Sequence, residues 1–168
     1  DVAQEKLADA IFKASRVLSE DPILEWDNHN SFLKQKTEWL NNKNFSELHY
    51  FGPGTNLKIG LANEHLWVGG ATKTQNGITC NPNMPSEEVF TTPHAYKVNG
   101  EVCSTKPLSY QGTLIEDIRV KFIDGKIVEA DSKKGKELLL KVLDSDEGAR
   151  RLGEVALVPH SSPISQTG

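Results

Sequence analysis

The sequence predicts an α+β fold: N-terminal helices, then a curled antiparallel sheet that forms a partial barrel, with one further helix. Three features of the chain carry this prediction. Apolar residues recur at three- and four-residue spacing through about the first 45 residues, which is the helical period. From Phe45 the spacing becomes two, as in half-buried strands. A helical spacing returns between Ser132 and Leu143.

The N-terminal segment contains two apolar stripes, and we expect both to pack into the core. The first stripe is interrupted at Asp21-Pro22, because the residue before a proline avoids the α region. The second follows the polar run 27–31 and ends at the polar run 41–44. The stripe residues are Leu7, Ala10, Ile11, Ala14, Val17 and Leu18 in the first, and Phe32, Leu33, Trp39 and Leu40 in the second.

The strands are predicted from alternation and from turn dipeptides. Apolar residues at 57, 59 and 61 alternate with polar or small ones, and further strands are expected at 66–68 and 154–158. Asn99-Gly100 and Asp124-Gly125 are the dipeptides that favour tight type I′ hairpins. The second of these should join strands 118–123 and 126–129, with Ile118, Val120 and Phe122 facing the core.

Composition excludes several classes of function. With 168 residues, 37% hydrophobic and 25% charged, the chain is long and apolar enough to be globular. The net charge is −4 and Lys and Arg are spread throughout, so we expect no nucleic-acid partner. No apolar run is long enough for a membrane span. Cys80 and Cys103 form neither a disulfide framework nor a metal motif, and we expect a cytoplasmic protein.

Two glutamates are the candidate functional residues. Glu88 and Glu154 each lie among apolar residues at the edge or in the interior of a predicted strand. A buried carboxylate is costly unless it is paired or holds a metal, so the two indicate an oxygen-rich metal site. Glu87 precedes Glu88, but neighbours in a strand point to opposite faces and only one can face a site. Solvent-exposed acids at turns are the alternative interpretation.

Three stretches of the chain resemble the aminopeptidase T family, also described as PepS-type or thermophilic metalloproteases. They are residues 83–93, 146–159 and 162–165, and the resemblance covers the whole chain, most sharply from Phe51 onward. It implies a cytoplasmic dinuclear metallo-aminopeptidase with two zinc, cobalt or manganese ions, peptide substrates and a homodimeric assembly. It also implies that Glu88 is a bridging metal ligand and Glu154 a second carboxylate ligand, with no further catalytic residue assigned.

Members of that family are much longer and draw further ligands, a histidine and a His-x-Asp pair, from beyond this stretch. The resemblance therefore implies a middle fragment that is inactive alone, with a helical lead-in at 1–45 and the beginning of the catalytic domain at 46–168. A dinuclear centre should bring Glu88 and Glu154 within roughly 8 Å, on neighbouring strands. The alternative is a non-catalytic β-rich module for assembly or binding, in which both glutamates are structural.

Overall fold

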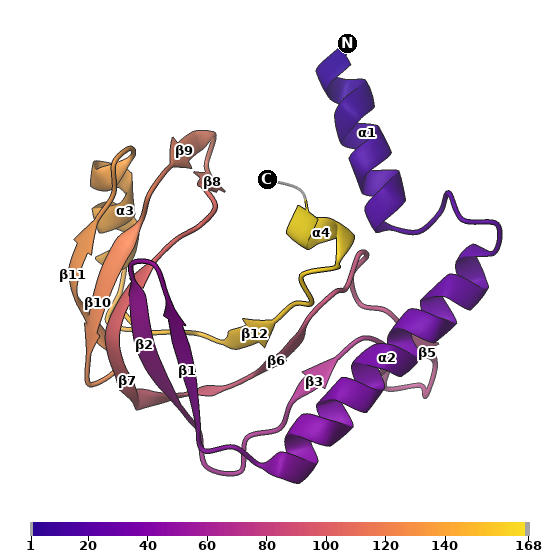
Figure 1. Cartoon of the computed structure of the whole chain (residues 1–168), viewed down its shortest axis with the longest axis horizontal. Coiled ribbons are helices and arrows are strands. Elements are labelled where there is room, and N and C mark those ends of the chain that lie inside the picture. The colour runs from indigo at the N-terminus through magenta and orange to yellow at the C-terminus, as the bar shows by residue number, and fades with distance from the viewer. Residues whose placement is uncertain (1, 167–168) are drawn as a thin grey trace. The chain divides into compact units, whose positions relative to one another are not determined.

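The computed structural model describes residues 2–166 and has the predicted α+β architecture of helices and antiparallel sheets (Figure 1). The strands form no closed barrel within these residues. The chain divides into two compact units: unit 1 comprises residues 1–44, 66–91 and 156–168, and unit 2 comprises 45–65 and 92–155. The boundary predicted between a lead-in at 1–45 and a catalytic domain at 46–168 stays a prediction.

Unit 1 begins with two helices, α1 (Val2–Ala14) and α2 (Pro22–Lys43). Asp21 caps α2 by accepting a hydrogen bond from Leu24 N, and Pro22 occupies a first-turn position that needs no N–H donor. The polar run 27–31 therefore lies inside α2, whereas we expected it to precede the helix. The cap and the proline fix the helix start, and the polar run contacts neighbouring segments instead of ending the helix.

The expectation that the first apolar stripe packs into the core is wrong. Leu7 and Leu18 are 62% and 60% exposed, and Ala14 is the stripe residue that is buried. Within the described residues α1 contacts α4 (Pro163–Gln166), and no layer covers its stripe. The stripe in α2 is covered in part: Leu33 and Leu40 are buried, while Phe32 and Trp39 remain exposed. Helical periodicity shows that a helix has an apolar face, not what covers that face.

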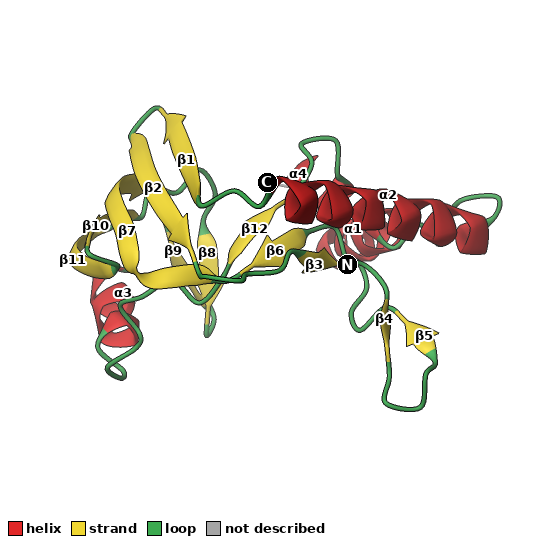
Figure 2. Ribbon diagram, turned by 90° about the horizontal axis from the view of Figure 1, so that it is seen from below, coloured by secondary structure: helices red, strands yellow, loops and turns green. Residues whose placement is uncertain are grey.

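A three-stranded sheet in unit 1 has the order β12-β6-β3. Its strands are β3 (Val68–Gly69), β6 (Val89–Thr91) and β12 (Val155–Leu157), and β12 belongs to unit 1 apart from its first residue. The strands near Val89 and Val155 are neighbours, which confirms that expectation. Helix α2 lies against β3 and β6, and the hairpin of β4 (Thr72–Lys73) and β5 (Thr79–Cys80) projects away from them (Figure 2).

Unit 2 is built on a five-stranded antiparallel sheet of order β1-β2-β7-β10-β11. The strands are β1 (Glu47–Gly52), β2 (Thr55–Leu61), β7 (Pro93–Cys103), β10 (Arg119–Ile123) and β11 (Lys126–Asp131). Residues 57, 59 and 61 of β2 are buried as predicted and Lys58 is exposed, but Gly60 is also buried, at a shift in the pairing with β7. The Asp124-Gly125 hairpin is also confirmed, with φ of 47° and 77° at its two residues. Helix α3 (Lys136–Leu143) lies against β11 and begins after Gly135, four residues later than expected.

The hairpin predicted at Asn99-Gly100 is wrong, because β7 runs straight through it. Gly100 pairs with Leu57 on one side and Phe122 on the other. A Cβ atom there would lie 2.1 Å from the Asn56 carbonyl oxygen, so glycine is needed for close approach between strands. The turn that the sequence analysis missed joins β8 (Leu108–Tyr110) to β9 (Thr113–Ile115) through 111–112.

No helix among residues 2–166 combines the length and apolar character that crossing a bilayer requires.

Candidate metal centre

Glu88 directly precedes β6, and the burial of this segment alternates with a period of two. Glu87, Val89 and Thr91 are buried, while Glu88 and Phe90 are half-buried. Glu88 therefore lies on the opposite face of the chain from Glu87, as the strand period predicts. On the β3 side the backbones approach closely: a Cβ atom on Gly69 would lie 2.4 Å from the Glu88 carbonyl oxygen.

Glu154 directly precedes β12 and is exposed, although its apolar neighbours indicated burial. The reason is local, since the residue follows Gly153 and lies outside the strand ladder. Glu88 belongs to unit 1 and Glu154 to unit 2. The separation of roughly 8 Å that a dinuclear centre requires therefore stays a prediction.

The donor chemistry of these two glutamates fits a divalent ion, but the number of ligands falls short. Among residues 2–166, neither carboxylate makes a hydrogen bond or an ion pair, so both have oxygens free to bind a cation. A catalytic site of this kind takes about three protein ligands per ion. No group of three His, Cys, Asp or Glu side chains suited to a metal gathers within the described part of the chain. Glu88 and Glu154 could thus supply part of a ligand set.

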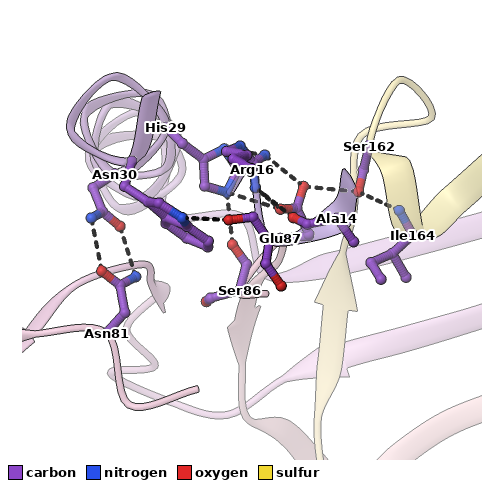
Figure 3. Close-up of polar contacts among 11 residues, drawn as sticks. Ala14, Arg16, His29, Asn30, Asn81, Ser86, Glu87, Ser162 and Ile164 are labelled. Atoms are coloured by element: carbon purple, nitrogen blue, oxygen red, sulfur yellow. Dashed lines mark hydrogen bonds and ion pairs between the residues drawn. The ribbon is translucent and has the colours of Figure 1, made fainter. Parts of the chain in front are cut away.

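Among residues 2–166, the buried charged residue of unit 1 is Glu87, whose side chain is 6% exposed (Figure 3). Arg16 Nη1 donates to its Oε1 at 2.5 Å and Arg16 Nη2 to its Oε2 at 3.2 Å. Ser162 Oγ donates to Oε2 at 2.9 Å. Arg16 lies between α1 and α2, and Ser162 directly precedes α4, so Glu87 joins segments far apart in the chain. We refer to Arg16, His29, Glu87 and Ser162 as the Glu87 cluster.

His29 on α2 connects Arg16 to the segment ahead of β6. Arg16 Nη2 lies 3.1 Å from His29 Nδ1, and because arginine nitrogens only donate, Nδ1 must accept. The ring proton is then on Nε2, which donates to the Ser86 carbonyl at 2.7 Å. Nε2 also lies 3.5 Å from Glu87 Oε1, so His29 adds a polar contact to the same carboxylate.

Arg16 is itself held in place before it reaches Glu87. Its backbone is left-handed, with φ of 59°, and its guanidinium carbon lies 4.9 Å from the centroid of the Trp26 ring. Nη1 also donates to the Ala14 carbonyl at 3.2 Å, and Trp26 Nε1 donates to the Ser15 carbonyl at 2.9 Å. The guanidinium is thus oriented by α2 and by the end of α1.

Burial by itself raises the pKa of Glu87, because a carboxylate loses its hydration inside the protein. The hydrogen bonds from Arg16 and Ser162, with the nearby positive charge, outweigh burial, and the pKa of Glu87 lies below its ordinary value. Glu87 is therefore ionised at neutral pH. This role of Glu87 was not predicted from the sequence. The period of two around Glu87 could have indicated burial, but Arg16, 71 residues away, had no local signal.

The assignment of Glu88 and Glu154 as metal ligands stays a prediction, and comparison with known proteins gives the family. Residues 1–168 match the thermophilic metalloprotease (M29) family, and the chain belongs to it.

Among its relatives are aminopeptidase T of Thermus aquaticus, 53% identical over 166 residues, and aminopeptidase 2 of Geobacillus stearothermophilus, 48% identical over 163 residues. These alignments cover 99% and 97% of this chain, but 41% and 40% of the relatives. The structure is similar to that of wild-type AmpT from Thermus thermophilus, with a TM-score of 0.90 at 51% identity, over 98% of this chain and 40% of that one. The chain thus spans about two fifths of the length of the relatives it matches.

Proposed function

We propose that this chain is part of a metal-dependent aminopeptidase that removes N-terminal residues from peptides, and that Glu88 and Glu154 bind its two divalent ions. The observation that carries the proposal is the 53% identity to aminopeptidase T, spread over nearly the whole chain. The working protein is longer than this chain, acts in the cytoplasm and assembles as a homodimer.

The free carboxylates are the part of this structure that the proposal uses. Zinc, cobalt or manganese ions would supply Lewis acidity for the attack of water on a peptide carbonyl. Glu88 and Glu154 would hold these ions, while the remaining ligands come from the rest of the longer protein. Glu87 is excluded as a ligand, because Arg16 and Ser162 already bind both of its oxygens.

The test is metal removal and restoration in the full-length protein that contains this chain. A chelator should abolish release of leucine from leucyl peptides, and zinc, cobalt or manganese should restore it. Glu88→Gln and Glu154→Gln keep the side-chain size but weaken a ligand, and each should lower kcat/KM at least about 100-fold. Glu137→Gln, at an exposed position on α3, is a control that makes the same replacement outside the proposed site.

Two outcomes would overturn the proposal. Turnover that survives complete metal removal would exclude a metal-dependent peptidase. A full-length protein that binds metal but hydrolyses no peptide would favour the alternative of a β-rich module for assembly or binding.

A further inference from the structure

Glu87 adjoins the predicted ligand Glu88 but points to the other face of the chain, into the Glu87 cluster (Figure 3). The cluster fixes the two residues that precede Glu88, which are Ser86 and Glu87. The Glu87 side chain is bound by Arg16 and Ser162, and the Ser86 carbonyl accepts a hydrogen bond from His29. The chain is thus anchored immediately before Glu88, through contacts that leave the Glu88 side chain untouched.

The chain is anchored immediately after Glu88 as well. Val89 pairs with Gly69 and Phe90 with Val68 in the β3–β6 ladder. The Glu88 carbonyl oxygen lies against Gly69, where even a methyl group would clash. Glu87 is held by the cluster and Val89 by the ladder, so the direction of the Glu88 Cα–Cβ bond is set.

The segment ahead of Glu88 has no strand ladder of its own, since residues 81–88 form bends and irregular backbone. Side chains from α2 hold it instead. Asn30 and Asn81 exchange two amide hydrogen bonds of 2.9 Å, and His29 binds at the Ser86 carbonyl. A metal ligand must be held within about 0.5 Å of its working position, which a free loop does not achieve. The cluster supplies the constraint that a ladder would otherwise give.

Stability alone is a weak explanation for such a cluster. Well-packed apolar side chains are often as stabilising as a buried ion pair, or more so. Hydrogen bonds between arginine and a carboxylate add directional constraint, because both groups are planar and bind in a fixed geometry. The arrangement at Glu87 therefore matches a need for defined geometry better than a need for burial.

We propose that Arg16, Glu87 and Ser162 are positioning residues: their buried hydrogen bonds fix the backbone ahead of β6 so that the Glu88 carboxylate is presented for metal binding. This inference rests on the proposed function. Loss of a cluster contact leaves the ligand in place but lets its backbone move, so metal binds more weakly. Saturating metal then restores most of the activity, which it does not do when a ligand itself is removed.

The test is Zn²⁺ affinity in the full-length protein, measured by competition with a chromophoric chelator well below the melting temperature. Glu87→Gln and Ser162→Ala should raise the Kd for Zn²⁺ about 10–100-fold, the usual effect of losing a contact behind a metal ligand. Both should keep the wild-type stoichiometry and recover most of their kcat at saturating Zn²⁺. Glu88→Gln should lose affinity without such recovery.

Asp21→Ala is the matched control. Asp21 caps α2 by accepting a hydrogen bond of 3.0 Å from Leu24 N, a contact that involves neither the segment 81–88 nor the β3–β6 ladder. Its loss should lower the melting temperature of unit 1 and leave the Kd for Zn²⁺ unchanged, which separates positioning from stability.

Three results would decide against the inference. Wild-type Zn²⁺ affinity in Ser162→Ala and Glu87→Gln, together with a loss in Glu88→Gln, would refute positioning and leave the proposed function standing. An equal loss of affinity in Asp21→Ala would show that general destabilisation of unit 1, and not positioning by the cluster, weakens metal binding. Full Zn²⁺ binding and turnover by Glu88→Gln would remove the ligand assignment on which both proposals depend. If Glu87→Gln fails to fold, Ser162→Ala decides, because it removes only the hydroxyl's hydrogen bonds with Glu87 and Ile164 N and leaves the Arg16–Glu87 pair in place.

Discussion

Removing the Glu87 carboxylate should destabilise unit 1 and spare unit 2. Glu87→Ala leaves the Arg16 guanidinium, 15% exposed, without its partner and leaves the Ser162 hydroxyl without its acceptor. Breaking a buried ion pair costs about 3–5 kcal/mol, and the partial exposure of Arg16 favours the lower end, about 3 kcal/mol. For a unit of the size of unit 1 that is a drop of about 12–24 °C in melting temperature.

The distribution of aromatic residues allows each unit to be followed separately. All three tryptophans, Trp26, Trp39 and Trp67, lie in unit 1, and all three tyrosines lie in unit 2. In the 168-residue chain, tryptophan emission during urea denaturation therefore reports on unit 1 alone. Its midpoint should fall in Glu87→Ala, while tyrosine-derived signals of unit 2 should keep their wild-type midpoint.

The control for this prediction is Asp9→Ala, which breaks an exposed ion pair with Lys13 in the same unit. Exposed pairs contribute about 0–1 kcal/mol, so this variant should stay close to wild type. A second comparison replaces both charges: Arg16→Met combined with Glu87→Met should recover much of the stability that Glu87→Met alone loses. A Glu87→Ala midpoint equal to that of Asp9→Ala would refute a buried, paired carboxylate.

Four further outcomes are expected. The pKa of Glu87 is lowered in the folded state, so its contribution to stability is fully present above the unfolded-state pKa of about 4.3 and is lost as pH falls through the folded-state pKa. Glu87→Gln should remove this part of the acid dependence of the free energy of unfolding, measured by urea titrations at a series of pH values. Gly125→Ala should lower the melting temperature of unit 2, measured by circular dichroism, far more than Gly112→Ala does. Both glycines have φ of 77°, but only at Gly125 would the Cβ atom lie 1.8 Å from a carbonyl oxygen. Equal melting temperatures of the two variants would contradict this. The 168-residue chain alone should show no metal-stimulated peptide turnover, and activity matching the full-length protein would contradict the fragment interpretation. In a metal-loaded structure of the full-length protein, the Glu88 and Glu154 carboxylates should lie within roughly 8 Å, and wide separation would exclude a shared centre.

Periodicity predicted the elements whose stabilising contacts lie nearby in the chain. The buried apolar positions of β2 and the Asp124-Gly125 hairpin were predicted correctly, because each depends on adjacent residues that favour the same local structure. Asn99-Gly100 carries a similar turn signal but lies in the middle of β7. Strands on both sides pair with it, and these long-range hydrogen bonds override the preference of the dipeptide.

The candidate site shows the same division between local and distant information. That Glu87 and Glu88 face opposite ways follows from the strand period alone. The partners of Glu87 cannot be predicted from this period, because Arg16, His29 and Ser162 come from segments that meet only in the folded chain. Sequence patterns can therefore indicate which face a residue occupies, but not which side chains complete its surroundings.

Stability and positioning at the Glu87 cluster can be separated in one variant. Arg16→Met with Glu87→Met removes both charges together and substitutes apolar side chains of similar length, so the cost of an unpaired buried charge disappears. Methionine is flexible and makes no directional hydrogen bond, so the backbone before Glu88 loses its fixed orientation. This double variant should therefore melt close to wild type yet bind Zn²⁺ more weakly. If its affinity matched the wild type, packing alone would be enough to hold Glu88, and the hydrogen bonds of the cluster would have no role in placing the ligand.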